Sequence, residues 1–307
     1  MSAAPDLRPD GRAAPVSAEA LDRAVLRTVT YAGLFRYPLT LRQLHRGLMD
    51  VAVDLPTLCA RLEERPLRER VVQTEGFVHP AGCEDWVALR GSRGRHTEGL
   101  LARHGAALRL LAGFPSVRLV ALSGGCAYGN AVDDDVDVFL VVRGGRAWAA
   151  GLALMLLSRL LGVRRTLCLN YIVDEEALAL PESDLFTATE VVGLRPLAGR
   201  AAYRRFVAAN PWVARCYPNF FAAYEEESAA LPETRCPGWV EALLDLAPAP
   251  LIERASRLAL GAYLRWKARG HAGVALSPHR LKLHIRDHGP GLRAAFDVAV
   301  QGREGKP

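Results

Sequence analysis

The stretch LVALSGGCAYGNAVDDDVDVFLVV, Leu119–Val142, has an apolar run at each end, with glycines and four aspartates between them. Val117–Leu122 and Val136–Val142 are short, almost continuous apolar runs, and the second is dense in β-branched residues, which is typical of buried strands. Side chains alternate along a strand, so Asp135 and Asp137 point to one face while the valine between them points into the core. The stretch therefore predicts two buried strands with two carboxylates side by side where the second begins.

Two like charges held this close are unfavourable unless a cation lies between them, and a hard divalent ion bound through oxygen is the usual solution. Mg²⁺ suits such a site, because it takes one or two carboxylates and fills its remaining positions with water and phosphate oxygens. Gly124 and Gly125 directly follow the first strand, where backbone without side chains can approach a phosphate. These residues predict a site for a metal ion and a phosphate ester. Asp133 and Asp134 are interpreted as solvated turn residues.

A strand, a Gly-Gly pair, about ten residues and then Asp-x-Asp on a second apolar strand resembles the nucleotidyltransferase superfamily of the DNA polymerase β type. The resemblance is specific over residues 118–142 and extends to 173, about a fifth of the chain. The continuation, with NYIVDEEALALPESDL and TATEVVGLRPLAG, resembles uncharacterised bacterial proteins of that superfamily. The implied fold is α+β or α/β: a small mixed sheet with helices as a nucleotidyltransferase core over residues 114–178.

The resemblance implies an enzyme that depends on Mg²⁺ or Mn²⁺. It would move a nucleoside monophosphate from an NTP to an acceptor hydroxyl and release pyrophosphate. The acceptor is left open as a small molecule, a protein side chain or an RNA end. Asp135 and Asp137 would hold the metal and act in catalysis together with Asn170. The expected nucleotide-binding residues are Ser123, Gly124, Gly125, Tyr128 and Asn130, and Arg143, Arg146, Arg164 and Arg165 are candidates for neutralising phosphate charge.

Asn170 is the departure from the family pattern, because members usually carry a third carboxylate on a later strand. Here that strand, within Thr166–Val173, offers an amide, which can ligate a metal but cannot take a proton. Asp174 at the strand's end is the alternative. One alternative function follows from this departure: a weakened nucleotidyltransferase fold that senses a nucleotide and regulates DNA. A second alternative is a toxin-like enzyme that modifies tRNA or a protein.

The amino-terminal part predicts a flexible arm over residues 1–16 and a winged-helix-like module over residues 17–82. Ser17, Thr40 with Gln43, and Asp54 are predicted caps of three helices. The third helix carries a single arginine beside glutamates, so packing or substrate positioning is favoured over DNA reading, and DNA remains a weakly supported partner. The predicted elements are helices over Ser17–Gly33, Leu41–Leu48 and Leu55–Glu63 and a hairpin over Arg70–Pro80.

The remaining chain is predicted to be largely helical. Residues 83–113 connect the module to the core, with Leu89–His96 as a mobile loop because of its glycines and Thr97–Ala112 as a helix. A helix over Ala147–Leu161 follows the second strand. Residues 179–300 are predicted to form a helical carboxy-terminal region. The segment EEALAL at 175–180, directly before it, is also predicted to be helical.

Composition and charge narrow the function classes. The chain has 307 residues, half of them apolar, and a net charge of +6, which is carried mostly by arginine. Six cysteines without CxxC or paired histidine spacing indicate reduced thiols rather than disulfides or zinc. The sequence shows no signal peptide, and the apolar stretch at 147–162 is too short to span a membrane. We expect a cytoplasmic protein without a membrane partner.

Three weaker features complete the predictions. His284 and His288 lie one helical turn apart and are interpreted as a surface pair rather than metal ligands. Trp212 and Tyr217 are interpreted as core residues. Glu190, on a predicted helix, is left open as either lining the active-site cleft or simply exposed.

Overall fold

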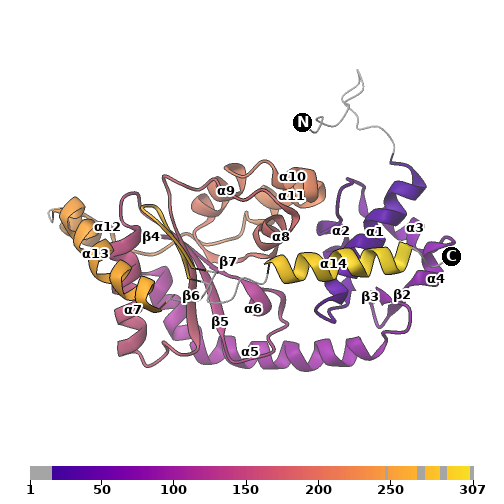
Figure 1. Cartoon of the computed structure of the whole chain (residues 1–307), viewed down its shortest axis with the longest axis horizontal. Coiled ribbons are helices and arrows are strands. Elements are labelled where there is room, and N and C mark those ends of the chain that lie inside the picture. The colour runs from indigo at the N-terminus through magenta and orange to yellow at the C-terminus, as the bar shows by residue number, and fades with distance from the viewer. Residues whose placement is uncertain (1–15, 246–247, 268–273, 284–288, 305–307) are drawn as a thin grey trace, which may run out of the picture.

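A computed structural model describes residues 16–245, 248–267, 274–283 and 289–304. Over these residues the chain is a mixed α+β protein with fourteen helices, a three-stranded antiparallel sheet and a six-stranded mixed sheet (Figure 1). The six-stranded sheet lies at one end of the long axis and the three-stranded sheet at the other (Figure 1).

The six-stranded sheet brings the two strands of the opening stretch together with the strand that carries Asn170. Its strands are β4 (Val117–Leu122), β5 (Val136–Val142), β6 (Leu167–Asp174), β7 (Arg195–Ala198), β8 (Val274–Ser277) and β9 (Arg280–Leu283). They are ordered β7-β4-β5-β6-β9-β8, and β5 with β6 is the parallel pair, while the other neighbours are antiparallel. The beginnings of β5 and β6 therefore lie at the same edge as the end of β4.

Helices cover both faces of this sheet, and successive side chains of β5 point alternately into the two hydrophobic cores on these faces. Val136, Val138 and Leu140 belong to one core, and Phe139 and Val141 to the other. The first core is covered by α5 (Asp85–Ala112), α7 (Ala147–Leu160) and α13 (Ala249–Lys267). The second is covered by α8 (Leu185–Gly193), α9 (Arg200–Ala208), α10 (Val213–Cys216) and α11 (Pro218–Glu227). The short helices α6 (Gly124–Tyr128) and α12 (Gly238–Asp245) complete this part.

The amino-terminal elements pack around a hydrophobic core of their own. The helix caps predicted for these elements are confirmed. The side chains of Ser17 and Asp54 accept hydrogen bonds from the backbone N–H groups of Ala20 and Thr57. Thr40 and Gln43 form the predicted capping box. The elements are α1 (Ala18–Gly33), β1 (Leu39–Thr40), α2 (Leu41–Arg46), α3 (Leu55–Leu62), α4 (Leu67–Arg70), β2 (Val71–Thr74) and β3 (Phe77–Pro80), with sheet order β1-β3-β2.

The predicted mobile loop at Leu89–His96 is wrong, because these residues lie inside the 28-residue helix α5, which runs between the two sheets (Figure 1). Glycine in a helix interior costs about 1 kcal/mol, which led to the loop prediction. Tertiary contacts offset that cost: the Arg90 guanidinium lies 4.3 Å from the ring centre of Tyr37, and Arg93 donates to the Phe35 carbonyl at 2.9 Å. The helix therefore joins the amino-terminal elements to the core.

The prediction that residues 179–300 are helical is also wrong in part, because β7, β8 and β9 lie in this region and extend the core sheet. In β9 the apolar Leu281 is fully buried and alternates with Arg280 and Lys282, a period of two that is typical of a strand. Residues 175–180, predicted as helical, form turns instead.

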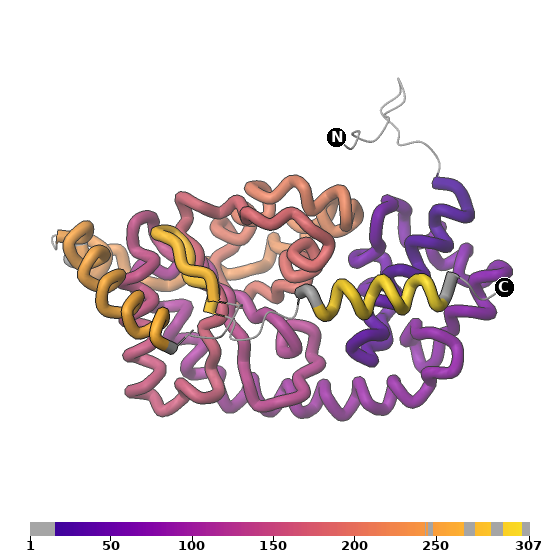
Figure 2. Tube along the Cα trace, in the orientation of Figure 1, coloured from indigo at the N-terminus to yellow at the C-terminus, as the bar shows by residue number. Residues whose placement is uncertain are grey.

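The last helix, α14 (Gly289–Glu304), returns to the amino-terminal elements (Figure 2). Its Phe296 is 4% exposed and makes an edge contact with Tyr31 of α1, with ring centres 5.4 Å apart. Two segments far apart in sequence thus pack together beside α8.

Two further predictions concern the whole chain. The six cysteines are all free thiols. In the described ranges, no helix combines the length and apolar character needed to cross a membrane.

Candidate active site

Asp137 lies against the glycine turn that follows β4. The Ser123 N–H donates to the Asp137 carbonyl at 2.9 Å, so the turn is fixed on the start of β5. Gly124 has φ +58°, and a Cβ placed there would lie 2.7 Å from Asp137 Oδ2. The carboxylate thus occupies space that only glycine leaves open, which confirms that Gly124 and Asp137 come together.

Asn170 reaches Asp137 because β6 runs parallel to β5 as its direct neighbour. Asp137 pairs with Cys168, and the alternation of side chains along β6 places Asn170 on the same face as Cys168, directly before the register shift between Val138 and Phe139. Its Nδ2 donates to Asp137 Oδ1 at 2.5 Å. The predicted neighbourhood of Asn170 and Asp137 is confirmed.

Asp174 does not complete this site, because it pairs with Val142 at the far end of the two strands. Its carboxylate is buried and accepts hydrogen bonds from the Gly145 N–H at 2.7 Å and the Glu176 N–H at 2.9 Å. Asp174 therefore stabilises the turn after β5, and the alternative that it replaces the third carboxylate is wrong.

The other three aspartates are exposed. Asp133 Oδ1 accepts a hydrogen bond from the Asp135 N–H at 3.3 Å, which is a local turn contact. Asp134 Oδ1 lies 3.6 Å from the His96 ring. The interpretation of Asp133 and Asp134 as turn residues in solvent is confirmed, while Asp135 is exposed next to Asp137.

The charges of these carboxylates are poorly compensated. Burial, followed by the charges of Asp135 and Asp133, raises the pKa of Asp137 to about 6, although the Asn170 hydrogen bond opposes the shift. Burial and the neighbouring charges of Asp133 and Asp134 raise the pKa of Asp135. A divalent cation would remove this repulsion, so the residues fit a metal ion bound through carboxylate oxygens.

Asp137 opens into a cavity of about 940 Å³ between the amino-terminal elements, the core sheet and α8. Its volume lies near the upper end of the range for small-molecule sites. Of the predicted site residues, Asp135 and Asn170 do not line it, whereas Ser123, Gly124, Gly125, Tyr128, Asn130 and Asp137 do.

The amino-terminal elements hold Tyr128 and Asn130 in place. Tyr37 donates from its hydroxyl to the Tyr128 carbonyl at 2.7 Å, and the two rings make an edge contact. Arg93 donates to Asn130 Oδ1 at 3.2 Å. Hydrogen bonds from α5 and from the loop after α1 thus hold Tyr128 and Asn130 of the predicted nucleotide-binding segment in place.

The arginines that line this cavity are not those predicted. Arg143 and Arg146 follow the far end of β5, and Arg164 and Arg165, although they precede β6 at the near edge, do not line the cavity. Arg36 and Arg195 do line it, and Arg195 pairs across the sheet with Leu122, directly before the glycine turn. Strand pairing between β7 and β4, which no sequence pattern indicated, is the reason that Arg195 was missed.

Three weaker predictions have mixed outcomes. Glu190 lines the cavity and is also exposed, so each of its two interpretations holds in part. Tyr217 is 2% exposed, as expected of a core residue, and its hydroxyl lies 2.6 Å from the Thr189 hydroxyl at the cavity wall. Trp212 is partly buried and donates from its ring N–H to Asn210 at 3.2 Å. His284 and His288 lie outside the described residues.

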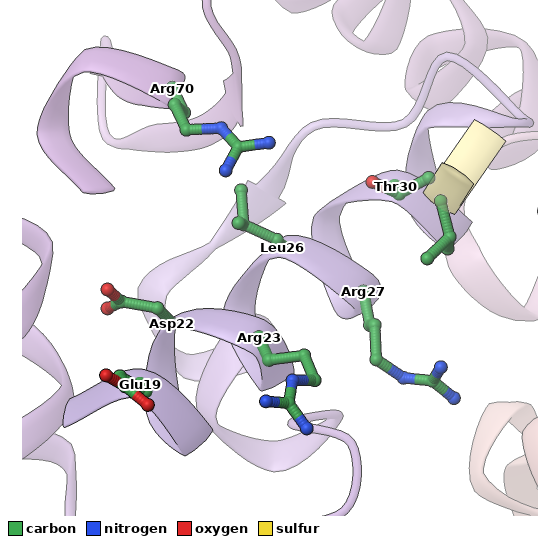
Figure 3. A pocket seen from close by; sticks show the side chains of 8 residues that line it. Glu19, Asp22, Arg23, Leu26, Arg27, Thr30 and Arg70 are labelled. Carbon is green, nitrogen blue, oxygen red and sulfur yellow. The ribbon is translucent and has the colours of Figure 1, made fainter. Parts of the chain in front are cut away.

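A separate opening of about 550 Å³ lies on α1, lined among others by Glu19, Asp22, Arg23 and Arg70 (Figure 3). Asp22 is already engaged there, since its carboxylate pairs with Arg61 at 2.6 Å. This opening contains none of the predicted site residues.

Comparison of the chain with models of protein families, with curated proteins and with solved structures gave no match. The described residues define a mixed α+β protein in which a carboxylate and a glycine turn meet at the mouth of a large cavity.

Replacing Asp137 with asparagine should stabilise the metal-free protein at neutral pH. Because the folded state raises the pKa of Asp137 to about 6, ionisation of this group opposes folding, and its effect grows as the pH rises from about 4 and is complete above about 6. We expect Asp137→Asn to raise the free energy of unfolding by about 1–2 kcal/mol at neutral pH.

The measurement is urea unfolding of both proteins in EDTA at several pH values. The gain should vanish towards pH 4, where the wild-type carboxyl is protonated, and Mg²⁺ or Mn²⁺ should stabilise only the wild type. A gain that is independent of pH would contradict the stated cause.

Proposed function

We propose that the protein is a nucleotidyltransferase that uses Mg²⁺ or Mn²⁺ to move a nucleoside monophosphate from an NTP to an acceptor hydroxyl, with release of pyrophosphate. The observation that carries the proposal is the contact between Gly124 and Asp137, where a Cβ on the glycine would lie 2.7 Å from a carboxylate oxygen. This contact joins the glycine pair after β4 to the Asp-x-Asp sequence of β5, the two parts of the motif on which the resemblance to the DNA polymerase β type rests.

The sheet supports this proposal in its finer features. β4 ends at the glycine turn, β5 begins at the aspartates, and the parallel neighbour β6 carries Asn170 beside Asp137. This is the arrangement expected of a polymerase β-like core. The amino-terminal order of helix, strand, helices and two strands likewise supports a winged-helix-like module.

In this proposal the chain's own residues bind and orient the triphosphate. Asp135 and Asp137 would hold the metal ion, which supplies charge neutralisation at the phosphates when bound. Gly124 and Gly125 are the first two residues of α6, and the first N–H groups of a helix have no acceptor within it. Because Ser123 makes no side-chain capping bond, these two N–H groups can donate to phosphate oxygens. Arg195 and Arg36 line the same cavity and, within the described residues, have no ion-pair partner.

The transfer step joins the acceptor oxygen to the α-phosphorus and breaks the bond to the β-phosphate, so pyrophosphate leaves. Asn170 donates its N–H to Asp137 and orients that carboxylate. It cannot accept the acceptor's proton, so the proton passes to another group or to water.

The cavity favours a small acceptor over an RNA end or a protein side chain. Its walls come from three parts of the chain, and most of the lining is apolar or aromatic. Sites that enclose ligands in this way are typical of small molecules.

DNA remains the less supported partner. Arg61, the one basic residue of α3, pairs with Asp22 at 2.6 Å and also with Glu64. A DNA-reading helix needs basic or amide side chains that are free to reach phosphates and bases.

A second candidate, a nucleotide-binding regulator without transfer activity, is favoured by one observation. The third position of the metal site is an amide whose N–H, not its oxygen, faces Asp137. This arrangement would hold a nucleotide while lacking a base beside the metal.

The test is incubation of the protein with Mg²⁺, each α-labelled NTP and a small-molecule cell extract. We expect one labelled product, equimolar pyrophosphate, and loss of both in EDTA. Mg²⁺-dependent NTP binding without product would favour the regulator, and absence of both binding and product would contradict the proposal. A labelled tRNA or protein would instead select the toxin-like alternative.

A further inference from the structure

Glu190 places a carboxylate in the cavity from α8, on a different wall from the glycine turn. Among the described residues it makes no hydrogen bond and no ion pair. The side chain is exposed to the interior of the cavity, and desolvation by the surrounding walls is the first cause that raises its pKa. A carboxylate in such surroundings is unfavourable unless it is protonated or meets a cation.

Two basic side chains of the cavity, Arg46 and Lys282, are paired with other groups. Arg46 donates to Glu227 at 2.7 Å and to the Val192 carbonyl at 2.9 Å. The Nζ of Lys282 lies 3.8 Å from Glu182. Within the described residues neither cation pairs with Glu190, and no ion pair joins it to Arg36 or Arg195 of the same cavity, so its carboxylate is open to a ligand.

Tyrosines line the same cavity as the carboxylate. Five of the chain's eight tyrosines line this cavity. Burial, followed by the charge of Glu190, raises the pKa of Tyr128. Burial raises the pKa of Tyr31 to about 12, and Glu190 adds to that shift. These two phenols therefore lie close enough to Glu190 to sense its charge, and Tyr128 is 39% exposed.

We propose that Glu190, with Tyr31 and Tyr128, forms a binding site for a small organic cation, an ammonium group attached to an apolar or aromatic body. The carboxylate neutralises the ammonium, the electron-rich ring faces attract it, and the apolar walls accept the body. That this cation is also the hydroxyl-bearing acceptor rests on the function proposed above.

Binding to this site should depend on pH. Burial and then the charge of Asp137 on β5 raise the pKa of Glu190 to about 7, while Lys282 on β9 opposes the shift. Tyr31 and Tyr128 stay neutral at this pH because their pKa values are raised. Glu190 is therefore ionised above about pH 7 and attracts a cation there.

The experiment compares two probes of nearly equal size, 2-phenylethylamine and the neutral 2-phenylethanol, by ligand-observed NMR titration without NTP or metal. At about pH 8 the wild type should bind the amine about tenfold more tightly than the alcohol, since one desolvated charge pair contributes roughly this factor. The preference should fall as the pH is lowered to about 6.

Two variants make the test specific. Glu190→Gln keeps the size of the side chain and should abolish the preference while leaving alcohol binding unchanged. Thr187→Val changes another polar side chain that α8 contributes to the same cavity, and it should retain the preference for the amine.

Equal binding of the two probes by the wild type, no detectable binding of the amine, or an unchanged preference in Glu190→Gln would each overturn the proposal. Because neither NTP nor transfer enters the measurement, its result is independent of whether the protein proves to be a nucleotidyltransferase.

Discussion

Replacing Asp137 with alanine is expected to lower nucleotidyl transfer by about 10³-fold or more, because the buried carboxylate of the metal site is lost. Asp137 is the aspartate that contacts both the glycine turn and Asn170, whereas its neighbours face solvent. The measurement is the initial rate of labelled-product formation from the NTP under saturating Mg²⁺, with Mn²⁺ affinity measured in parallel.

The matched control is Asp134→Ala, in the same acidic cluster. Asp134 is exposed, lies 3.6 Å from the His96 ring and does not line the cavity, so this variant should transfer at close to the wild-type rate. Equal losses in both variants would mean that the cluster acts only through its summed charge. Full activity in Asp137→Ala would remove Asp137 from the site.

Replacing Gly199 with alanine is expected to destabilise the protein by about 3–4 kcal/mol, since two unfavourable terms add. Gly199 has φ +103°, a conformation that side chains with a Cβ rarely adopt. Its Cβ would also overlap the carbonyl oxygen of Arg118 and approach Leu119 Cα to 2.8 Å. Both belong to β4, so relief would require β7 and β4 to move apart.

The measurement is chemical unfolding followed by circular dichroism, and Gly162→Ala is the control. Gly162 also has positive φ, +69°, but a Cβ there meets nothing within 4 Å, so it isolates the conformational term of about 1 kcal/mol. If the two variants lost equal stability, the close packing of Gly199 on β4 would not matter.

Local signals in the sequence predicted the elements that rest on neighbouring residues. The caps at Ser17, Thr40 and Asp54 need only a side chain and an N–H group three residues away, so they could be predicted from the chain alone. The same holds for β5, where strict alternation placed Asp137 on the face opposite Val136 and Val138.

Predictions failed where distant contacts decided the outcome. Gly91 and Gly94 predicted a loop, yet Arg90 and Arg93 hold this part of α5 on residues more than thirty positions away in the sequence. The short strands of the carboxy-terminal part were missed for a related reason, since each gains its hydrogen bonds only from a partner in the core sheet.

The sequence by itself determined the acidic motif: two strands, a glycine turn between them, and a division of the four aspartates into a pair on one face and a pair in the turn. This is because strand alternation and turn chemistry act over a few residues. Only the tertiary structure decided what surrounds Asp137. The parallel pairing of β6 with β5 brings Asn170 to it and leaves Asp174 at the far end of the strand. The packing of α5, α8 and β7 adds Arg93, Glu190 and Arg195 to the same cavity, because long-range packing, and not local sequence, fixes which helices and strands become neighbours.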